Sequence, residues 1–315
     1  MQCLPLRNIL YSVFISDYSV HMCLRPSPGT RKLNSPSNNQ HVFMNLRALR
    51  YLSHHISVLA RHMSSTLPSY RLASVSPNPL YTPGASSPPP FPHKDQEDFT
   101  TILPGNVSAD YKLLISAVTP RPIAFISTKG QDGICNLSPY SFFNAMGHDP
   151  PTLTFGCVAR RASSDGMSDT HRNLLDTKVC CVHIISDWMV EAANHSCGAY
   201  DPEVDEIPLT GLTTIPCKSV DVPRIKECAV AMECSLEASH EIKNGEGKVT
   251  STIMICRVLA THVNNHVYDA EKGVVDTALL RPISRLGGDT YGQVSGCFDL
   301  PRPNKDGSLG ELRFG

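Results

Sequence analysis

Side chains that could bind a flat, polar ligand are concentrated in residues 136–144, a short segment with the composition of a β-strand. If this segment is extended, alternate residues share one face. One face would hold Asn136, Ser138, Tyr140, Phe142 and Asn144, and it is too polar for a dry core. Pro139 has no backbone N–H, so the segment cannot be a central strand paired on both sides. We therefore expect a ligand or another group to occupy its free side.

A second group of chemically useful residues lies just before a helix that is expected to begin near Asp169. The loop and the first helical turn contain Arg160, Arg161, Ser163, Ser164, Ser168 and Thr170. Hydroxyls, guanidinium groups and free backbone N–H groups at a helix N-terminus can bind a phosphate. The alternative is a simple helix cap beside a solvated loop, and the loop taken alone favours that alternative.

The two segments taken together favour a single ligand. A planar heteroaromatic ring with donors and acceptors on its edge would use the polar strand and the backbone groups that Pro139 leaves unpaired. A phosphate on the same ligand would reach the loop. Flavin mononucleotide (FMN) has both parts, so it is the cofactor that the sequence predicts.

Strand-like runs dominate the chain after residue 95. They are rich in β-branched and apolar residues, and they cover residues 121–128, 151–159, 178–185, 227–239 and 248–263. An Asn-Gly pair at 244–245 predicts a hairpin turn between the last two strands. Short helices are expected at 168–177 and 188–196. Many strands without strand–helix alternation predict a mainly β fold, a closed barrel with short helical additions.

Charge divides the chain into two parts. Residues 1–94 contain nine Lys and Arg against the single acidic residue Asp17, a net charge of +8, whereas residues 95–315 contain 19 basic and 28 acidic residues, a net charge of −9. An acidic body argues against nucleic-acid binding, which needs a basic surface. None of the 12 cysteines forms a CxxC pair. We therefore expect reduced thiols and no metal site.

Residues 1–94 are predicted to be an extension and a linker outside the folded domain. Residues 44–61 space leucines and arginines at helical intervals without an acidic residue, which is typical of an organellar presequence; a disordered tail or an over-extended gene model is an equal alternative. Eight prolines in 68–92 indicate an extended linker. The predicted folded domain is then 95–303, followed by a flexible tail, 304–315. The run NILYSVFIS is too short to span a bilayer, and we expect a cytoplasmic or mitochondrial protein without a membrane segment.

Five motifs in this order resemble the flavin reductase-like, FMN-binding split-barrel proteins, the group that contains flavoredoxin. They are TPRPIAFIST, GICNLSPYSFFNAMGHDPPTLTFG, SDTHRNLLDT, GLTTIP and LRPISRLGGDTYG, and the similarity extends from about residue 108 to 303. The resemblance implies a Greek-key split β-barrel, a homodimer and FMN bound near the subunit interface. The residues implied to line the flavin ring and ribityl chain are Arg121, Pro122, Ala124, Asn136, Ser138, Tyr140, Ser141, Phe142 and Asn144. Those implied to meet the phosphate are Ser168, Asp169, Thr170 and Asn173. The family commonly has Lys where this chain has Ser168, and Arg160 or Arg161 could restore that charge.

The resemblance also implies an activity in which the cofactor carries the chemistry and the protein positions it. Hydride from NADH or NADPH would reach the flavin, and electrons would pass to a small-molecule or protein acceptor. The residues expected to shape the open flavin face are His148, Arg281, Arg285 and Tyr291, whereas His183 is expected to be structural. Two alternatives stay open: an FMN-binding electron carrier without efficient NAD(P)H turnover, and a non-enzymatic split-barrel module that binds haem or a protein.

Overall fold

The computed structural model describes residues 100–160, 163 and 165–311, together with residue 77 and four short strands nearer the N-terminus. The chain divides into two units, residues 1–65 and 66–315. The first unit contains an antiparallel sheet of β1 (Leu4–Leu6), β2 (Ile9–Ser16) and β3 (Ser19–Arg25). The predicted presequence helix, 44–61, lies outside the described residues, and the domain boundary near residue 95 stays a prediction.

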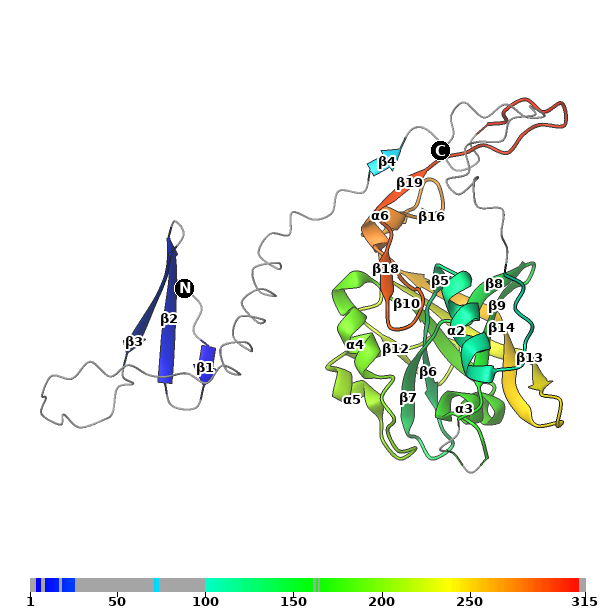
Figure 1. Cartoon of the computed structure of the whole chain (residues 1–315), viewed down its shortest axis with the longest axis horizontal. Coiled ribbons are helices and arrows are strands. Elements are labelled where there is room, and N and C mark those ends of the chain that lie inside the picture. The colour runs from blue at the N-terminus through cyan, green and yellow to red at the C-terminus, as the bar shows by residue number, and fades with distance from the viewer. Residues whose placement is uncertain are drawn as a thin grey trace, which may run out of the picture. The chain divides into compact units, whose positions relative to one another are not determined.

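The second unit is built on a seven-stranded antiparallel sheet with the order β7-β6-β10-β13-β14-β9-β8 (Figure 1). Its strands are β6 (Ala124–Lys129), β7 (Cys135–Tyr140), β8 (Phe143–His148), β9 (Pro151–Val158), β10 (Val179–Ile184), β13 (Val230–Lys243) and β14 (Val249–Val263). All the predicted strand runs are present, with boundaries shifted by a few residues. The predicted mainly β fold is confirmed.

The segment 136–144 is not one strand, as the sequence suggested, but parts of two. β7 and β8 form opposite edges of the sheet, yet only Ser141 and Phe142 separate them in the chain. Because three Cα steps span at most about 11 Å, the sheet must curl until its edges approach each other. The ring of Tyr140 on β7 accordingly lies 5.5 Å from that of Phe155 on β9. The curled sheet is the split barrel.

Two hydrophobic cores lie on the two sides of β6. Alternate residues of a strand face opposite sides, so Ile126 packs with Phe155, Val182 and Met254 in the barrel. Phe125 instead belongs to the second core, whose other buried members are Ile123, Leu137, Ile185, Met189, Ala193, Ile207, Ile225, Cys228 and Ile283. Each large apolar side chain buried in this way contributes about 1.5–3 kcal/mol. Burial on both faces fixes β6, and therefore the register of its neighbour β7.

Short helices pack against the barrel strands. They are α2 (Val107–Ala117), α3 (Asp169–Thr177), the 3₁₀ turn η1 (Asp187–Met189), α4 (Val190–His195), α5 (Glu206–Thr210) and α6 (Thr277–Leu280). The predicted helices at 168–177 and 188–196 are present, and α2 is an additional helix in which Ile115 is the one buried residue. No helix among the described residues is long and apolar enough to cross a membrane.

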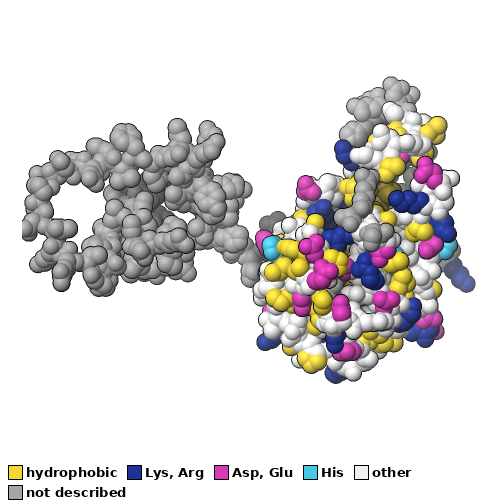
Figure 2. All heavy atoms as spheres, turned by 90° about the horizontal axis from the view of Figure 1, so that it is seen from below, with side chains coloured by type: hydrophobic (Ala, Val, Ile, Leu, Met, Phe, Trp, Pro, Cys, Tyr) yellow, Lys and Arg dark blue, Asp and Glu magenta, His cyan; other side chains and the backbone are white. Residues whose placement is uncertain are grey.

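Small sheets complete the second unit. β5 (Arg121–Pro122), β17 (Ile283–Arg285) and β18 (Tyr291–Gln293) form one antiparallel sheet with β17 in the middle. The other pairs are β11 (Thr214–Pro216) with β12 (Pro223–Ile225), β15 (Tyr268–Asp269) with β16 (Val274–Val275), and β19 (Gly296–Phe298) with β4 (Arg71–Ala73). The face in Figure 2 mixes acidic, basic and hydrophobic side chains.

Candidate functional site

The polar edge strand β7 is hydrogen-bonded to the first turn of α3. The side-chain amide of Asn136 lies 2.6 Å from Thr170 Oγ1, and the Tyr140 hydroxyl lies 3.1 Å from Ser168 Oγ. The two segments that the sequence predicted to share one ligand are therefore in contact. One turn further along α3, Asn173 Nδ2 donates to Thr128 Oγ1 of β6 at 3.1 Å.

The N-terminus of α3 is capped but keeps two backbone donors available. Ser168 has an extended backbone, and its Oγ accepts a hydrogen bond from His171 N at 3.3 Å. The first N–H groups of a helix have no partner inside the helix. Among the described residues, no acceptor is bonded to the N–H of Asp169 or of Thr170. These two donors can bind an anion.

Asp169 and Arg160 form an ion pair at the same helix end. The Asp169 carboxylate accepts from Arg160 Nη1 at 3.1 Å and from Arg172 Nη1 at 2.9 Å. A second nitrogen of Arg160 donates to Tyr200 O at 3.0 Å. Arg160 is therefore held beside the predicted phosphate site but is already engaged with Asp169, and Asp169 binds arginines here. Arg161 lies outside the described residues.

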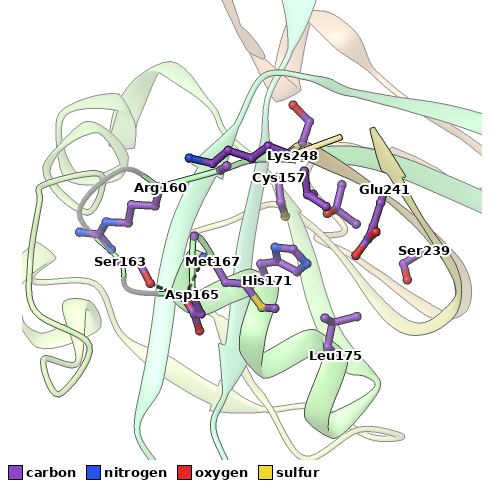
Figure 3. A pocket seen from close by; sticks show the side chains of 15 residues that line it. Cys157, Arg160, Ser163, Asp165, Met167, His171, Leu175, Ser239, Glu241 and Lys248 are labelled. Carbon is purple, nitrogen blue, oxygen red and sulfur yellow. Dashed lines mark hydrogen bonds between the residues drawn. The ribbon is translucent and has the colours of Figure 1, made fainter. Parts of the chain in front are cut away.

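A pocket opens beside this helix end and has a volume of about 430 Å³ (Figure 3). Gly166, Met167 and His171 line it from the loop and α3, and Lys248 and Glu241 line it from the β13–β14 hairpin. Of the described residues that the sequence singled out, Arg160 and Ser163 belong to its lining. Figure 3 shows Lys248 reaching over the pocket toward Arg160. Lys248 could not be selected from sequence alone, because its hairpin meets the loop only in the folded chain.

Glu206 is a second residue that sequence reasoning missed. It lies in a charged segment, DPEVDE (201–206), yet it is only 6% exposed. The carboxylate accepts from Leu137 N on the unpaired edge of β7 at 3.1 Å. The sequence predicted that a ligand or another group occupies the free side of this strand. At Leu137, that group is a side chain of the protein itself, Glu206. A buried Glu next to Asn136 could not be found from sequence spacing, since 70 residues separate them.

Arg121, Arg285 and Tyr291 come together on the small sheet β5–β17–β18. Arg285 pairs in register with both Arg121 and Tyr291, and its guanidinium lies 4.5 Å from the Tyr291 ring centroid. The Tyr291 hydroxyl donates to Asn194 Oδ1 at 2.8 Å. Burial, followed by the nearby charge of Arg285, lowers the pKa of Arg121. The sheet therefore concentrates two cations and an aromatic ring.

The guanidinium of Arg121 holds three chain segments together. It donates to Ile115 O at 2.5 Å and Val118 O at 2.8 Å, both near the end of α2. It also donates to Leu286 O at 2.9 Å and to Ser141 Oγ at 3.4 Å. Arg121 therefore organises the backbone around β5, with its donors directed at protein acceptors.

The other predicted residues are more dispersed. Arg281 binds Asp187 Oδ1 through Nε at 2.8 Å and stacks on Trp188 with its guanidinium carbon 5.2 Å from the ring centroid. Pro122 is exposed on β5, Ala124 is buried on β6, Ser138 is half-buried on β7, and Phe142 is half-buried between β7 and β8. Asn144 and His148 are exposed on β8. The structure thus places these residues around the curled edges of the barrel and not in one pocket.

His183 has a structural environment. Its Nδ1 lies 2.7 Å from Phe125 O, and its Nε2 accepts from Ile225 N at 3.0 Å. Burial lowers the pKa of His183 to about 4, so the ring is neutral with its proton on Nδ1. Both nitrogens are used inside the core. Within the described part of the chain, no cluster of His, Cys, Asp and Glu could hold a metal ion.

Comparisons with known proteins agree with the architecture. The model of the flavin reductase like domain family matches residues 116–280. The uncharacterized protein YwrF of Bacillus subtilis is 37% identical over 194 residues, which cover 62% of this chain and 93% of that protein. Nitrilotriacetate monooxygenase component B from Bacillus cereus is similar in structure, with a TM-score of 0.59, 32% identity and coverage of 62% and 96% of the two chains.

A second solved structure shows the same relationship. Pseudomonas fluorescens 2-nitrobenzoate 2-nitroreductase NbaA has a TM-score of 0.57 and 26% identity, and the match covers 65% of this chain and 98% of that one. The sequence motifs, the curled antiparallel sheet and the family match agree with one another. This chain belongs to the flavin reductase like domain family.

Proposed function

We propose that this protein is an FMN-binding oxidoreductase that takes hydride from NADH or NADPH and passes electrons to a further acceptor. The observation that carries the proposal is the contact between β7 and the first turn of α3, made by Asn136 with Thr170 and by Tyr140 with Ser168. This contact joins a polar, half-open strand to a helix N-terminus. It also lies beside the pocket of about 430 Å³.

The donor set suits a flavin phosphate. The N–H groups of Asp169 and Thr170, the Thr170 hydroxyl and the cationic Lys248 are the groups that anions select at a helix N-terminus. Lys248 brings a positive charge to the pocket from the β13–β14 hairpin, whereas Ser168 carries none where the family commonly has Lys. It has no ion-pair partner among the described residues.

The edge of β7 suits the flat part of the cofactor. Pro139 provides no N–H, and β7 pairs with β6 on one side only. When bound, FMN would supply the hydride- and electron-transfer chemistry. The protein would hold the phosphate at α3, orient the ring along β7, and present Arg285 and Tyr291 as the cationic and aromatic pair next to it. The family membership and the two enzymes with similar structures support the oxidoreductase assignment.

Titration of the purified chain with FMN and with riboflavin tests the binding site. We expect Thr170→Val and Lys248→Met, at about pH 6, to weaken FMN binding several-fold or more, because each removes a charge-assisted contact of about 1.5–3 kcal/mol. Riboflavin, which has no phosphate, should bind the variants and the wild type equally. Lys226→Met, an exposed lysine outside the pocket, is the matched control. Unchanged FMN affinity in both site variants would contradict the phosphate assignment.

Stopped-flow mixing with NADH and then with NADPH separates an enzyme from an electron carrier. Fast bleaching of the flavin absorbance band is expected for a reductase. Slow bleaching with both nucleotides, while FMN stays tightly bound, would indicate the carrier. A wild-type protein that binds no FMN would exclude both and favour a non-enzymatic split-barrel module.

We also propose that the chain forms a homodimer. Helix α2 exposes Val107, Tyr111 and Leu114, with exposed fractions of 78%, 53% and 53%. Such a row of exposed apolar residues on one helix is typical of a surface that binds another protein. Light scattering after gel filtration should give twice the chain mass of 34.4 kDa, and Leu114→Lys should reduce it to that of a monomer.

A further inference from the structure

Glu206 places a buried carboxyl group against the free edge of β7, one contact away from the proposed phosphate site. Oε2 accepts from Leu137 N at 3.1 Å, and Oε1 lies 3.2 Å from the side-chain amide of Asn136. The same amide lies 2.6 Å from Thr170 Oγ1. A continuous line of polar contacts therefore runs from Glu206 through Asn136 to the first turn of α3.

The direction of these hydrogen bonds depends on the proton of Glu206. An ionised carboxylate is only an acceptor, so the Asn136 NH₂ group must face Glu206 and its oxygen must accept the Thr170 hydroxyl hydrogen. A protonated carboxyl group can donate to the Asn136 oxygen. The NH₂ group then donates to Thr170 Oγ1, and the Thr170 hydroxyl hydrogen becomes free to point elsewhere.

We propose that Glu206 is a positioning residue whose proton sets the orientation of the Asn136 amide and thereby releases the Thr170 hydroxyl to donate to a bound phosphate. The inference rests on the proposed function, because the phosphate is that of FMN. With FMN bound, Glu206 holds a proton taken from solvent, its carboxyl O–H donates to Asn136 Oδ1, and Thr170 donates to the phosphate. Without FMN and at alkaline pH, Glu206 is ionised and the Thr170 hydroxyl donates to Asn136.

The surroundings of Glu206 allow this exchange near neutral pH. Burial raises the pKa of Glu206 to about 7; hydrogen bonds from the backbone N–H groups of Glu206 itself and of Leu137 oppose the rise, and the charges of Asp169 and Asp205 add to it. The titratable side chains on the elements packed around it are Asp169, His171, Arg172 and Asp176 on α3, Asp205 beside α5, Glu191 and His195 on α4, and Cys135 and Tyr140 on β7. A phosphate at α3 adds negative charge, so its binding favours the protonated form further.

Protonation of Glu206 and binding of FMN favour each other. The form that releases the Thr170 hydroxyl carries one more proton, so the contribution of Glu206 favours FMN binding at low pH and weakens it above about pH 7. A single coupled proton changes affinity by at most about tenfold per pH unit. FMN titrates too, so only the difference between variants reports on Glu206.

Glu206→Gln tests the proposal, because glutamine mimics the protonated carboxyl group at every pH. Its oxygen accepts from Leu137, and its NH₂ donates to Asn136. In FMN titrations, Glu206→Gln and wild type should agree within about twofold at about pH 6, and Glu206→Gln should bind about tenfold tighter at about pH 8.5. Glu203→Gln, an exposed carboxylate in the same segment, should follow the wild type. Parallel pH profiles of Glu206→Gln and wild type would overturn the proposal.

Thr170→Val provides a second test that does not require the Glu206 variant to fold. The wild-type advantage over Thr170→Val should be about tenfold at about pH 6 and disappear at about pH 8.5, where the hydroxyl hydrogen is directed at Asn136. An advantage that does not change with pH would overturn the inference but leave FMN binding itself intact. A wild type that binds no FMN at any pH would overturn the proposed function, and this inference with it.

Discussion

Two buried glutamates in this domain have opposite acid–base properties. Glu206 beside β7 and Glu233 on β13 are 6% and 0% exposed. Burial raises the pKa of Glu206 to about 7. At Glu233, burial also acts to raise the pKa, but hydrogen bonds from Lys218, His262 and Ser219 outweigh it and lower the pKa to about 2.

The donors around each carboxyl group explain the difference. Glu233 accepts from Lys218 N and Ser219 N at 2.6 Å each, and from His262 Nε2 at 2.5 Å. Apart from its own N–H, Glu206 has one backbone donor, Leu137 N at 3.1 Å, and the side-chain amide of Asn136, which can turn either way. Hydrogen bonds to the charged form stabilise it. A buried glutamate with three fixed donors anchors a loop, whereas one with fewer donors can exchange a proton.

Removal of the Glu233 carboxylate should have the largest effect on stability. Glu233→Ala leaves two backbone N–H groups and His262 without their acceptor, and we expect a loss of about 3–5 kcal/mol in the free energy of unfolding, measured by urea denaturation at neutral pH. In the wild type, this contribution is fully present above about pH 4.5 and is lost as pH falls through about 2. A loss below about 1 kcal/mol in the free energy of unfolding would show that the three donors around Glu233 do not make its carboxylate important for stability.

Removal of one donor should have an intermediate effect. His262→Ala leaves Glu233 with its two backbone donors, so we expect a loss of about 1.5–3 kcal/mol, the value of one hydrogen bond to a charged group. Urea denaturation of His262→Ala and of His266→Ala, an exposed histidine, provides the measurement and its control. Equal losses would show that the donors around Glu233 do not determine its role.

The stability effect of Glu206→Gln should be smaller and of the opposite sign. The pKa of Glu206 is raised in the folded state, so ionisation costs stability as pH rises from about 4.5 to about 7 and the full cost remains above that range. With allowance for solvent screening, we expect Glu206→Gln to be about 1 kcal/mol more stable than wild type at about pH 8 and equal at about pH 4. Thermal denaturation at both pH values would detect it. A gain in stability of Glu206→Gln over wild type at about pH 4 would contradict a raised pKa for Glu206 in the folded state.

Substitution of an exposed glutamate should have the smallest effect on stability. Glu237 pairs with Arg257 at 2.9 Å, and the two side chains are 49% and 45% exposed. Glu237→Ala should change stability by less than about 1 kcal/mol. A larger change in stability would mean that burial does not explain why the buried glutamates affect stability more than the exposed ion pair does.

The sequence predicted the local elements well where one physical signal dominated. β-branched runs gave β9, β10, β13 and β14, and Ser168 marked the start of α3 as its N-cap. The edge position of β7 followed from Pro139 alone, because a residue without N–H cannot pair on both sides. Helix α2 was not identified, although its apolar residues Val107, Tyr111, Leu114 and Ile115 recur at helical intervals.

The site was only partly predictable. The contact of Asn136 with Thr170 agrees with the prediction that β7 and the helix start share one site. Glu206 and Lys248 could not be selected, because each reaches the site from a segment distant in sequence. Predicted residues such as Asp169 and Arg121 are engaged by other protein groups, which sequence spacing does not report.

The sequence by itself determined the β-rich fold, its family and the polar character of β7, because these depend on residue type and on periods of two to four residues. Only the tertiary structure decided that a glutamate from α5 meets the open edge of β7, and that one buried carboxyl group gains three donors while another gains fewer. The pKa of a buried group is set by the partners that folding brings within hydrogen-bonding distance. The partners of these two glutamates lie 14 to 70 residues away along this chain.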